Sequence, residues 1–337
     1  MIKNKKSIIN RKFNSLVVRK KTEKKFTYKI EKTKFDTLEK NELIIKVSYS
    51  SINYKDYLVC HGKYWDCRRY PLIPGIDAAG TIVFSQNKKF KNGDKVIVMA
   101  RITGTKKPGG FSEYIKVPYN WAEKIPKTMT LKKAMIFGTA GFTAMAAIDR
   151  LLKKPYKKEK NILVSGSTGG VGLFSLYILS QLGYKVTAST TKSSKKNFLK
   201  KMGANIVLSH KEFTDVDGLS LQKIKYSGII DSVGEKLIST ASRQLINKGK
   251  IISVGMMSNP YCNLNLTPFI LRGIELIGLH VESFTNLERQ KIWKKIELFS
   301  KNRNFTKIYK LIKFKNISSV LKKFSSKKRI GRFVIKI

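Results

Sequence analysis

The sequence predicts an α/β protein with two domains, one β-rich and one built on a doubly wound parallel sheet. Three observations support this prediction. The chain has 337 residues, which is more than one hydrophobic core usually organises. Strand-like segments dominate its first third, whereas strand-like and helix-like segments alternate after Leu131. A glycine-rich stretch, NILVSGSTGGVG from Asn161 to Gly172, stands inside the alternating part.

Short apolar segments with strand character fill the first third of the chain. ELIIKVSYSSI (Glu42–Ile52) alternates and is rich in β-branched residues, and GTIVFS, DKVIVMA and EYIKV follow it. KNGDK (Lys91–Lys95) contains Asn-Gly, which is a strong signal for a tight turn or hairpin. We therefore expect a compact β-rich domain over residues 13–131, preceded by a disordered extension over residues 1–12.

Helix-like and strand-like segments alternate in the rest of the chain. Residues 132–154 have helical periodicity, and NILVSG, KVTAST, NIVLSH, SGIIDSVG and GKIISVG have the pattern of strands. Helix-like segments between them end at Gly183 and Gly203. This alternation predicts a parallel sheet with helices on both faces over residues 132–272. The tail, residues 273–337, contains an amphipathic helix (NLERQKIWKKIELFS) and a closing strand (GRFVIKI).

The chain is strongly basic. It has 68 Lys and Arg against 22 Asp and Glu, a net charge of +46, which suggests contact with nucleic acid or a membrane surface. However, the lysines are spread along the whole chain, and Ile and Asn, whose codons are also AT-rich, are abundant. Codon bias is therefore the favoured explanation, and no specific nucleic-acid partner is expected. No apolar run reaches the roughly 18–20 residues of a membrane span, so no membrane association is expected.

The cysteines give no sign of a disulfide framework or a metal site. Cys60, Cys67 and Cys262 are odd in number and widely spaced, which favours a reducing, cytoplasmic location. Cys60, His61 and Cys67 lie close together in sequence, but a structural zinc site usually needs four ligands in paired short spacings. We predict that this cluster binds no metal.

The glycine-rich stretch places a flexible polar loop between a strand and a helix. Its spacing is Ser167-x-Gly169-x-x-Gly172, with Ser where the usual dinucleotide fingerprint has its first glycine. Gly169 would let the backbone approach a pyrophosphate, and Gly172 would let the helix pack close to the strand. The helix N-terminus would offer N–H groups to the phosphates. A plain turn is the alternative, but the βαβ context favours a Rossmann dinucleotide site. The expected contacts are Thr168, Gly169, Gly170 and Val171.

The residues after the next strand indicate which dinucleotide binds. An NAD site usually has Asp or Glu there, about 20 residues beyond the glycines. This chain has Thr190, Thr191 and Lys192, and no acidic residue before Glu212. Hydroxyl groups and a cation suit the 2′-phosphate of NADPH, although Lys192 is one lysine among many. We predict NADPH as the cofactor, bound in part by Thr190, Thr191 and Lys192.

Several stretches together resemble one known family. They are SINYKDYL (51–58), PLIPGIDAAGTI (71–82), GGFSEY (109–114), GTAGFTAM (138–145), SGSTGGVG (165–172), IIDSVG (229–234) and PFILRGIELIG (268–278). They are similar to the zinc-free medium-chain dehydrogenase/reductases, most closely the quinone-oxidoreductase-like group of bacterial acrylyl-CoA reductases (the YhdH/YhfP type). The resemblance extends over about residues 13 to 337. It implies a GroES-like catalytic domain, interrupted by a Rossmann domain and completed by residues 273–337.

The resemblance also implies roles for individual residues. Asn53, Tyr54 and Asp56 of the NYKD motif would be catalytic and face the nicotinamide and the substrate. Tyr54 would be a hydrogen-bond donor or would position the cofactor, although spacing alone favours a half-buried core tyrosine. Thr139 would lie near the nicotinamide ring, and it is also a candidate helix N-cap.

Two further strand ends belong to the predicted cofactor site. Asp231 ends a strand at the carboxyl edge of the sheet, where ligands bind in open α/β folds. Ser232 is expected to line the cofactor at this edge. Gly255 marks the end of the next strand and is expected to do the same.

The resemblance argues against a catalytic metal. Zinc-bearing relatives carry an early Cys and a His-Glu pair, and the corresponding places here hold Asn53-Tyr54 and Ile76-Asp77. With few soft ligands left, Lewis-acid alcohol oxidation is not expected.

The implied activity is reduction of a carbon–carbon double bond conjugated with a carbonyl. NADPH would supply hydride, and hydrogen-bond donors would stabilise the enolate. Acrylyl-CoA, which would become propionyl-CoA, is the preferred substrate. One alternative is a quinone or 2-alkenal reductase on the same scaffold, and another is a basic RNA-binding protein that retains an enzyme fold. The expected partners are an acyl-CoA thioester, enone or quinone, and a second copy in a homodimer.

Overall fold

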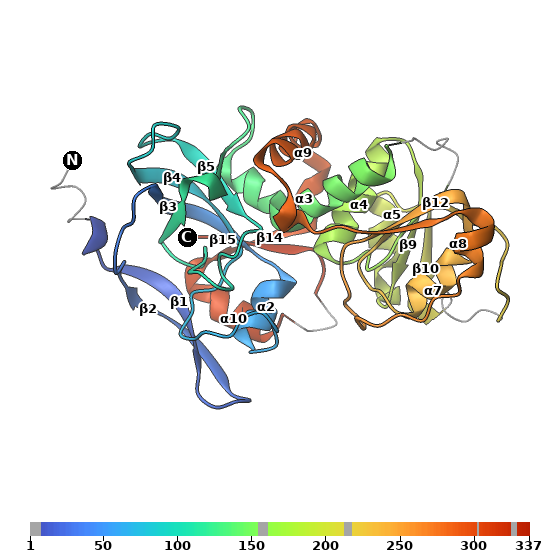
Figure 1. The fold of residues 1–337 in the computed structure, drawn as a ribbon, viewed down its shortest axis with the longest axis horizontal. Helices are drawn as coiled ribbons and strands as arrows, with labels where there is room; N and C mark the ends of the chain where they lie inside the picture. The colour runs from blue at the N-terminus through green and yellow to red at the C-terminus, as the bar shows by residue number, and fades with distance from the viewer. Residues whose placement is uncertain (1–7, 154–160, 212–217, 302, 325–328) are drawn as a thin grey trace. The chain divides into compact units, whose positions relative to one another are not determined.

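The computed structural model describes residues 8–153, 161–211, 218–301, 303–324 and 329–337, and these form two compact units (Figure 1). Unit 1 comprises Met1–Thr139, Thr285–Lys301 and Tyr309–Ile337, and unit 2 comprises Ala140–Phe284 and Asn302–Ile308. Residues 1–7 of the predicted extension lie outside the described residues. Ile8 and Ile9 are described, and they pack against a hydrophobic cluster that includes Phe13.

Unit 1 is built mainly on antiparallel strands. Its large sheet has the order β14-β15-β3-β4-β5-β7, with β6 also paired to β3, and β1 and β2 form a separate two-stranded sheet. Only the β14–β15 pair in the large sheet is parallel. The strands are β1 (Phe13–Lys20), β2 (Phe26–Thr33), β3 (Glu42–Ile52), β4 (Asp77–Ser85), β5 (Lys95–Met99), β6 (Tyr114–Pro118), β7 (Ala122–Lys124), β14 (Tyr309–Lys313) and β15 (Arg332–Lys336).

The predicted strand Glu42–Ile52 is confirmed as β3 and organises this sheet. Because successive side chains of a strand point to opposite faces, Leu43 and Ile45 enter one hydrophobic cluster and Ile44 enters another. The strand is therefore buried on both faces. The predicted Asn-Gly turn joins β4 to β5, and Gly93 has a φ of 93° there.

Three helices that the structure describes lie entirely within unit 1, and two of them are short. They are α2 (Tyr54–Cys60), α9 (Asn286–Phe299) and α10 (Ile317–Lys322), with single 3₁₀ turns at Tyr119–Trp121 (η1) and Phe314–Asn316 (η5). The predicted amphipathic helix is confirmed as α9. It begins after Thr285, whose hydroxyl accepts a hydrogen bond from the Glu288 N–H in a capping box. Its buried face consists of Arg289, Ile292, Trp293 and Ile296.

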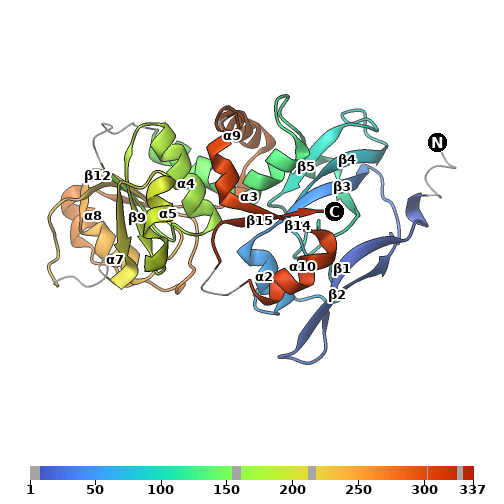
Figure 2. The ribbon, with the colours of Figure 1, turned by 180° about the vertical axis from the view of Figure 1, so that it is seen from behind.

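Unit 2 contains a parallel sheet with the strand order β10-β9-β8-β11-β12-β13. This is the order of a dinucleotide-binding fold, and the chain reverses direction across the sheet between β8 and β11. Figure 2 shows the helices around this sheet from behind. The elements are β8 (Asn161–Val164), α4 (Gly170–Gln181), β9 (Lys185–Thr190), η2 (Ser193–Lys195), α5 (Lys196–Lys201), β10 (Ile206–Ser209), β11 (Tyr226–Asp231), α7 (Lys236–Ser242), β12 (Leu245–Ser253), α8 (Thr267–Arg272), β13 (Glu275–Gly278), η3 (Val281–Ser283) and η4 (Arg303–Ile308).

The predicted mixture of a GroES-like β-rich domain and a Rossmann domain is confirmed by these two sheets and by the comparisons below. The predicted Rossmann segment, residues 132–272, stops short of β13, which pairs with β12 in the parallel sheet. In the structure Gly273 is only the left-handed end of α8, with a φ of 55°.

The predicted helix over residues 132–154 is largely α3 (Leu131–Leu151), but it is not continuous. Gly138 interrupts it with a φ of 47° and a ψ of −156°, a conformation that a residue with a side chain rarely adopts. Lys154 lies outside the described residues. Of the helices that the structure describes, none has both the length and the apolar character needed to cross a membrane.

Candidate functional site

The NYKD motif forms the beginning of α2. Asn53 is the N-cap, with an extended backbone, and its N–H donates a 2.7 Å hydrogen bond to Oδ2 of Asp56. Asp56 stands in the first turn, where a carboxylate interacts favourably with the helix dipole. The motif therefore has a local structural role, because Asn53 and Asp56 form a capping box at the start of α2.

The Asp56 carboxyl is fully buried and also anchors a neighbouring loop. Its Oδ1 accepts hydrogen bonds from the N–H groups of Gly75 (3.1 Å) and Ile76 (2.9 Å). Burial raises the pKa of Asp56 to about 7, and the nearby Asp77 carboxylate acts in the same direction, whereas the N–H donors oppose the rise. With no exposed surface, Asp56 contacts backbone rather than solvent.

Tyr54 is the exposed member of the motif. Its relative exposure is 37%, and its ring stacks on Tyr57 at a centroid distance of 5.8 Å. The guanidinium of Arg329 lies close enough for Tyr54 to favour its charged form. Burial, assisted by the like charge of Arg332, lowers the pKa of Arg329 to about 10, so this group remains a cation at neutral pH. Tyr54 thus offers a hydroxyl at the surface beside a positive charge.

A buried carboxylate, Asp77, joins the motif to two distant segments. Its Oδ2 accepts hydrogen bonds from the Ser51 hydroxyl (2.5 Å), Asn53 Nδ2 (2.9 Å) and the Thr139 N–H (3.0 Å). Its Oδ1 accepts the Thr139 hydroxyl at 2.5 Å. Arg332 Nη2 lies 3.4 Å from Oδ2 as the counter-charge. Of the residues predicted for the nicotinamide side, Asp77 therefore brings Asn53 and Thr139 together.

Arg332 is a site residue that the sequence analysis missed. Its Nη1 donates to Asn53 Oδ1 (3.1 Å) and its Nη2 to the Ser51 hydroxyl (2.6 Å). Burial lowers its pKa, and the negative charges of Asp77 and Asp56 oppose that change. Both ends of the Asn53 amide are thereby held. The only signal in the sequence was a charged residue at the start of the apolar strand GRFVIKI.

Gly138 is required by this cluster. A Cβ atom there would lie 2.5 Å from Arg332 Nη2, 2.6 Å from Asp77 Oδ2 and 2.7 Å from the Ser51 hydroxyl. The break in α3 therefore lets the backbone pass the ion pair and present Thr139 to Asp77. The position of the Asp77 carboxylate thus requires a residue without a side chain at 138.

In unit 2, the glycine-rich loop turns directly after β8. Gly166 has a φ of 57° and provides the left-handed residue of the turn. Ser167 is buried, its N–H donates to Ser189 O (3.1 Å) and its hydroxyl donates to Val164 O (2.7 Å). This explains why Ser can replace the usual glycine at position 167, because the positive φ falls on the preceding residue.

Helix α4 begins within the predicted fingerprint. Gly169 is its N-cap and Gly170 its first residue, so the N–H groups of Gly170 and Val171 belong to the first turn, which has no intrahelical acceptors. A Cβ at Gly172 would lie 2.6 Å from both Gly166 O and Ser167 Cα, whereas a Cβ at Gly169 would meet only Gly166 O, at 3.2 Å. Gly172 therefore allows close packing, and Gly169 keeps the approach to the helix N-terminus open. Thr168 between them is 7% exposed.

The end of β11 meets the same loop at the reversal point of the sheet. Asp231 accepts hydrogen bonds from the Ser165 hydroxyl (2.5 Å) and the Gly234 N–H (2.9 Å). Burial raises the pKa of Asp231, and these donors oppose the rise. The Ser232 hydroxyl donates to Ser165 O at 3.2 Å, and a Cβ on Gly255 would lie 3.1 Å from Ser232 O. The structure therefore brings together the predicted Ser232, Gly255 and the glycine loop.

The end of β9 lies beside this loop, through the hydrogen bond from Ser167 to Ser189. The Thr190 hydroxyl is 3.1 Å from the Lys192 N–H, which donates to it. Thr190 is buried, Thr191 is exposed and Lys192 is half-buried. Among the described residues the buried Ser189 hydroxyl has no hydrogen-bond partner. An open helix N-terminus and an unsatisfied hydroxyl fit a dinucleotide at this edge.

The candidate metal ligands do not form a site. Within the described ranges no group of three or more His, Cys, Asp and Glu side chains could hold a metal ion. Cys60 and Cys67 are core residues, and burial raises the pKa of both thiols, away from the thiolate that binds metals. The His61 Nδ1 is 2.8 Å from Tyr57 O. We derive no catalytic step through a metal.

Two family models match the chain. Residues 39–127 match the alcohol dehydrogenase GroES-like domain, and residues 170–299 match the model described as zinc-binding dehydrogenase. The second match begins at the first residue of α4 and extends through β9 to β13 of the parallel sheet and α9. It therefore includes Gly170, Gly172 and the end of β11.

Relatives with known names match most of the chain. It is 34% identical over 304 residues to the putative quinone oxidoreductase YhfP of Bacillus subtilis, covering 90% of this chain and 92% of the relative. It is 32% identical over 286 residues to the acrylyl-CoA reductase AcuI of Ruegeria pomeroyi, covering 84% and 87%.

Solved structures of two such proteins share the fold. The yhdH oxidoreductase of Salmonella enterica in complex with NADP has a TM-score of 0.91 at 29% identity, over 96% of this chain and 99% of that one. Bacillus subtilis yhfP with NAD bound has a TM-score of 0.92 at 32% identity, over 97% and 100%. The chain is therefore an oxidoreductase of the medium-chain dehydrogenase/reductase family, in the quinone-oxidoreductase-like group that contains YhfP, YhdH and AcuI.

Proposed function

We propose that this oxidoreductase uses NADPH to reduce a carbon–carbon double bond conjugated with a carbonyl, with acrylyl-CoA as the preferred substrate. The single observation that carries the proposal is the glycine loop at the reversal point between β8 and β11, where open parallel sheets bind dinucleotides. The preference for acrylyl-CoA is supported by the similarity to the AcuI reductases.

The cofactor would be held mainly by backbone groups of unit 2. The N–H groups of Gly170 and Val171 would bind the pyrophosphate, with Thr168 and Gly169 beside it. Ser232 and Gly255 would line the opposite strand end. These residues converge at one edge of the sheet, which supports their assignment as a group.

The choice of NADPH over NADH rests on the end of β9. The related Salmonella enterica oxidoreductase is in complex with NADP and Bacillus subtilis yhfP has NAD bound, so the choice depends on this chain's own residues. Thr190, Thr191 and Lys192 offer hydroxyl groups and a cation, and no carboxylate stands there to bond a ribose 2′-hydroxyl. This set suits a 2′-phosphate.

When bound, the reduced nicotinamide supplies the hydride. The exposed Tyr54 hydroxyl would donate a hydrogen bond to the substrate carbonyl, on which negative charge develops. Asn53 and Asp56 have their polar atoms engaged within the protein, so they would act as positioning residues that fix the start of α2. Asp77 and Arg332 would in turn hold Asn53 and Thr139.

A second candidate is reduction of quinones or 2-alkenals. The similarity to proteins named quinone oxidoreductase favours it. The substrate in that case has no CoA moiety. The named relatives reported above are all oxidoreductases, and the alternative of RNA binding gains no support from them.

The proposal is tested by following NADPH absorbance with acrylyl-CoA, crotonyl-CoA, acrolein and a naphthoquinone. We expect the highest kcat/KM with acrylyl-CoA. Tyr54→Phe should lower kcat about 10- to 100-fold, because one donor to the developing charge is lost. Tyr261→Phe, at an exposed tyrosine of unit 2, is the control. Absence of oxidation with every substrate would contradict the proposed reaction, and faster turnover of the quinone would favour the second candidate.

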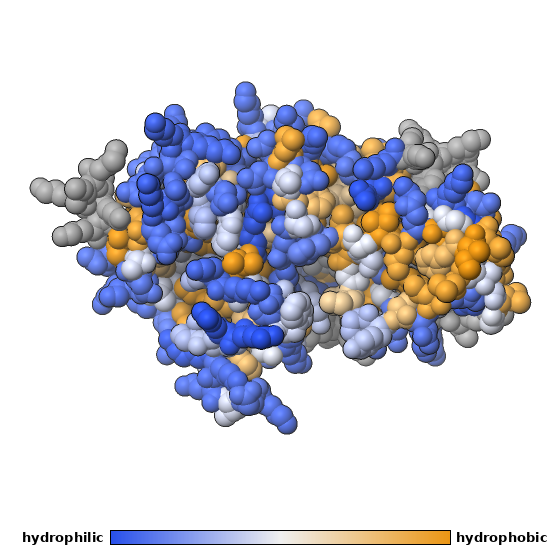
Figure 3. All heavy atoms as spheres, viewed as in Figure 1, coloured by the Kyte–Doolittle hydropathy of each residue, from blue (hydrophilic) through white to orange (hydrophobic). Residues whose placement is uncertain are grey.

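A homodimer is the proposed assembly. Among the strands that the structure describes, β13 pairs with β12 alone and stands at the edge of its sheet. Figure 3 shows hydrophobic side chains gathered over the α8 region. Leu266, Ile270 and Leu271 are 66%, 75% and 65% exposed, an unusual cluster for a free surface. Ile270→Lys should shift the protein toward monomer in light scattering. Leu287→Lys, at a similarly exposed leucine on α9, should not.

A further inference from the structure

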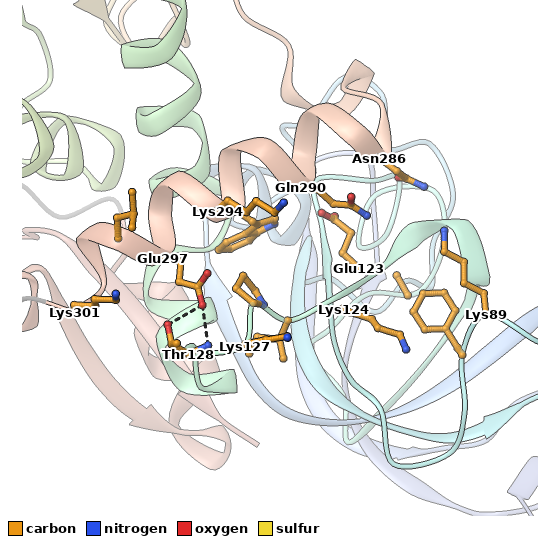
Figure 4. A pocket seen from close by; sticks show the side chains of 16 residues that line it. Lys89, Glu123, Lys124, Lys127, Thr128, Asn286, Gln290, Lys294, Glu297 and Lys301 are labelled. Carbon is orange, nitrogen blue, oxygen red and sulfur yellow. Dashed lines mark hydrogen bonds between the residues drawn. The ribbon is translucent and has the colours of Figure 1, made fainter.

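One cavity in unit 1 is lined by none of the site residues described above. It has a volume of about 570 Å³, within the roughly 300–1,000 Å³ of small-molecule sites. Helix α9 forms one wall, and β7 with the segment after it forms the other (Figure 4). The turn that carries Lys89 closes one end.

The floor of the cavity is apolar. Phe90 and Trp293 are 4% and 3% exposed, and both rings line it. Pro126 and Leu298 extend this apolar lining. Leu298 is 64% exposed, so an occupant with an apolar body would remove a large exposed side chain from water.

The two carboxylates in the lining are already engaged. Glu123 is buried and forms a 2.7 Å ion pair with Arg289. Glu297 accepts hydrogen bonds from the N–H and the hydroxyl of Thr128, both at 2.7 Å (Figure 4). These contacts use the carboxylates to attach α9 to the opposite wall. Glu123 is neutralised by Arg289, whereas Glu297, whose pKa the Thr128 donors lower, stays ionised and is outnumbered by the five lysines of the lining.

The rim, in contrast, is cationic. The lysines that line the cavity are Lys89, Lys124, Lys127, Lys294 and Lys301. Lys124 pairs with Asp94 at 3.1 Å. Within the described part of the chain, Lys89, Lys127 and Lys294 form no ion pair with a carboxylate. Lys294 and Lys127 stand on opposite walls (Figure 4), so a negatively charged group could lie between them.

We propose that this cavity binds an organic anion with an apolar body and one carboxylate or phosphate head group. The apolar body would cover Trp293, Phe90 and Leu298, and the head group would take the place of the missing counter-ions of Lys127 and Lys294. An inorganic anion would leave the apolar lining in water, and a neutral apolar molecule would leave the lysines unpaired. The occupant would contact α9 and the wall to which α9 is attached, so its binding would stabilise the folded protein.

The test is calorimetric titration of the full chain with decanoate and with decyl phosphate, below their micellar concentrations. Decanol and inorganic phosphate are titrated separately, as models of the apolar body and of the anionic head group. We expect one molecule of an amphiphilic anion to bind per chain, with each half at least about tenfold weaker. The tighter of decanoate and decyl phosphate identifies the head group. The titrations are repeated with saturating NADPH, which should not compete.

Two charge-matched variants separate a built site from general attraction to a basic protein. Lys294→Glu should weaken binding about tenfold. Lys291→Glu changes the net charge equally and lies on the same helix, exposed and outside the cavity lining, so it should leave affinity within about twofold. Equal losses in the two variants, competition by NADPH, or no binding at millimolar concentration would overturn the proposal. Because the readout is binding, none of these outcomes depends on reductase activity.

Discussion

The two units build their candidate sites from different material. In unit 1, side chains from three separate segments converge on one buried carboxylate, Asp77. In unit 2, the candidate site is a continuous loop that offers backbone N–H groups at the start of α4 and glycines that leave space beside them. Ser232 and Gly255 lie at adjoining strand ends. One site depends on side-chain chemistry at a distance, and the other depends on local backbone geometry.

This difference determines what each site tolerates. A backbone site is sensitive to any added atom that blocks the approach, but it is insensitive to most changes elsewhere. A buried ion pair is sensitive to loss of either partner, because the remaining charge has no water to solvate it. The following predictions test this contrast, beginning with the largest expected effect.

Arg332→Met should lower the free energy of unfolding by about 3–5 kcal/mol, because it leaves Asp77 buried without its counter-charge. Urea unfolding measures this loss. The control is Arg19→Met, whose ion pair with Glu31 is partly exposed at 39% and 22% and should contribute no more than about 1 kcal/mol. Similar losses of unfolding free energy in the two variants would show that the buried Asp77–Arg332 pair contributes no more to stability than the partly exposed Arg19–Glu31 pair.

Gly172→Val should raise the Kd for NADPH about 100-fold, or about 2.7 kcal/mol. The added Cβ would press on Gly166 O and Ser167 Cα, so the N-terminus of α4 must move away from the loop. Gly278→Val is the control, because a Cβ there has no heavy atom within 4 Å. Fluorescence titration with NADPH measures both, and an unchanged Kd for Gly172→Val would contradict the backbone account.

Asp56 should make the protein less stable as pH rises from about 4 to about 7. Its pKa is raised to about 7 in the folded state and lies near 3.9 in an unfolded chain, so the folded state binds the extra proton in this window. The resulting slope is at most about 1.4 kcal/mol per pH unit. Unfolding free energies measured across this range should lose the slope in Asp56→Asn. A slope of the same size in the variant would assign it to other groups.

Lys192→Asp should weaken NADPH about five- to tenfold more than NADH, because it replaces a cation beside the proposed 2′-phosphate with an anion. Because a general distortion of the loop would weaken both cofactors, the ratio of the Kd for NADPH to the Kd for NADH isolates the effect on the 2′-phosphate. Lys185→Asp, an exposed lysine at the start of β9, is the matched control. Equal weakening of both cofactors by Lys192→Asp would remove the argument for the phosphate.

The same contrast explains what could be predicted from the sequence. The loop from Ser165 to Gly172 could be identified because all of its determinants are adjacent: a strand, spaced glycines and a helix start. Strands such as Glu42–Ile52 could be identified for the same reason, since alternation is a local property. The family resemblance added the NYKD motif and singled out Tyr54 for a polar contact, but it also expected Asn53 and Asp56 to face the nicotinamide and the substrate. The structure separates one exposed tyrosine from two side chains that are held within the protein.

The parts that could not be predicted depend on contacts between distant residues. Arg332 lies 255 residues after Asp77, and nothing near it in the chain indicates an ion pair. The break of α3 at Gly138 has the same origin, because helical periodicity continues across it and the obstacles to a side chain there come from Arg332, Asp77 and Ser51. The membership of β13 in the parallel sheet is likewise decided by its pairing with β12.

The position of β15 between β14 and β3 has a consequence for biosynthesis. Phe333 pairs with Ile52, so β3 gains its β15 neighbour only after nearly the whole chain has been translated. During that time the Asp77 carboxylate has no arginine beside it, whereas every strand of the parallel sheet has already left the ribosome. A product cut short before Arg332 would therefore contain every strand of the parallel sheet but lack β15 and the counter-charge of Asp77.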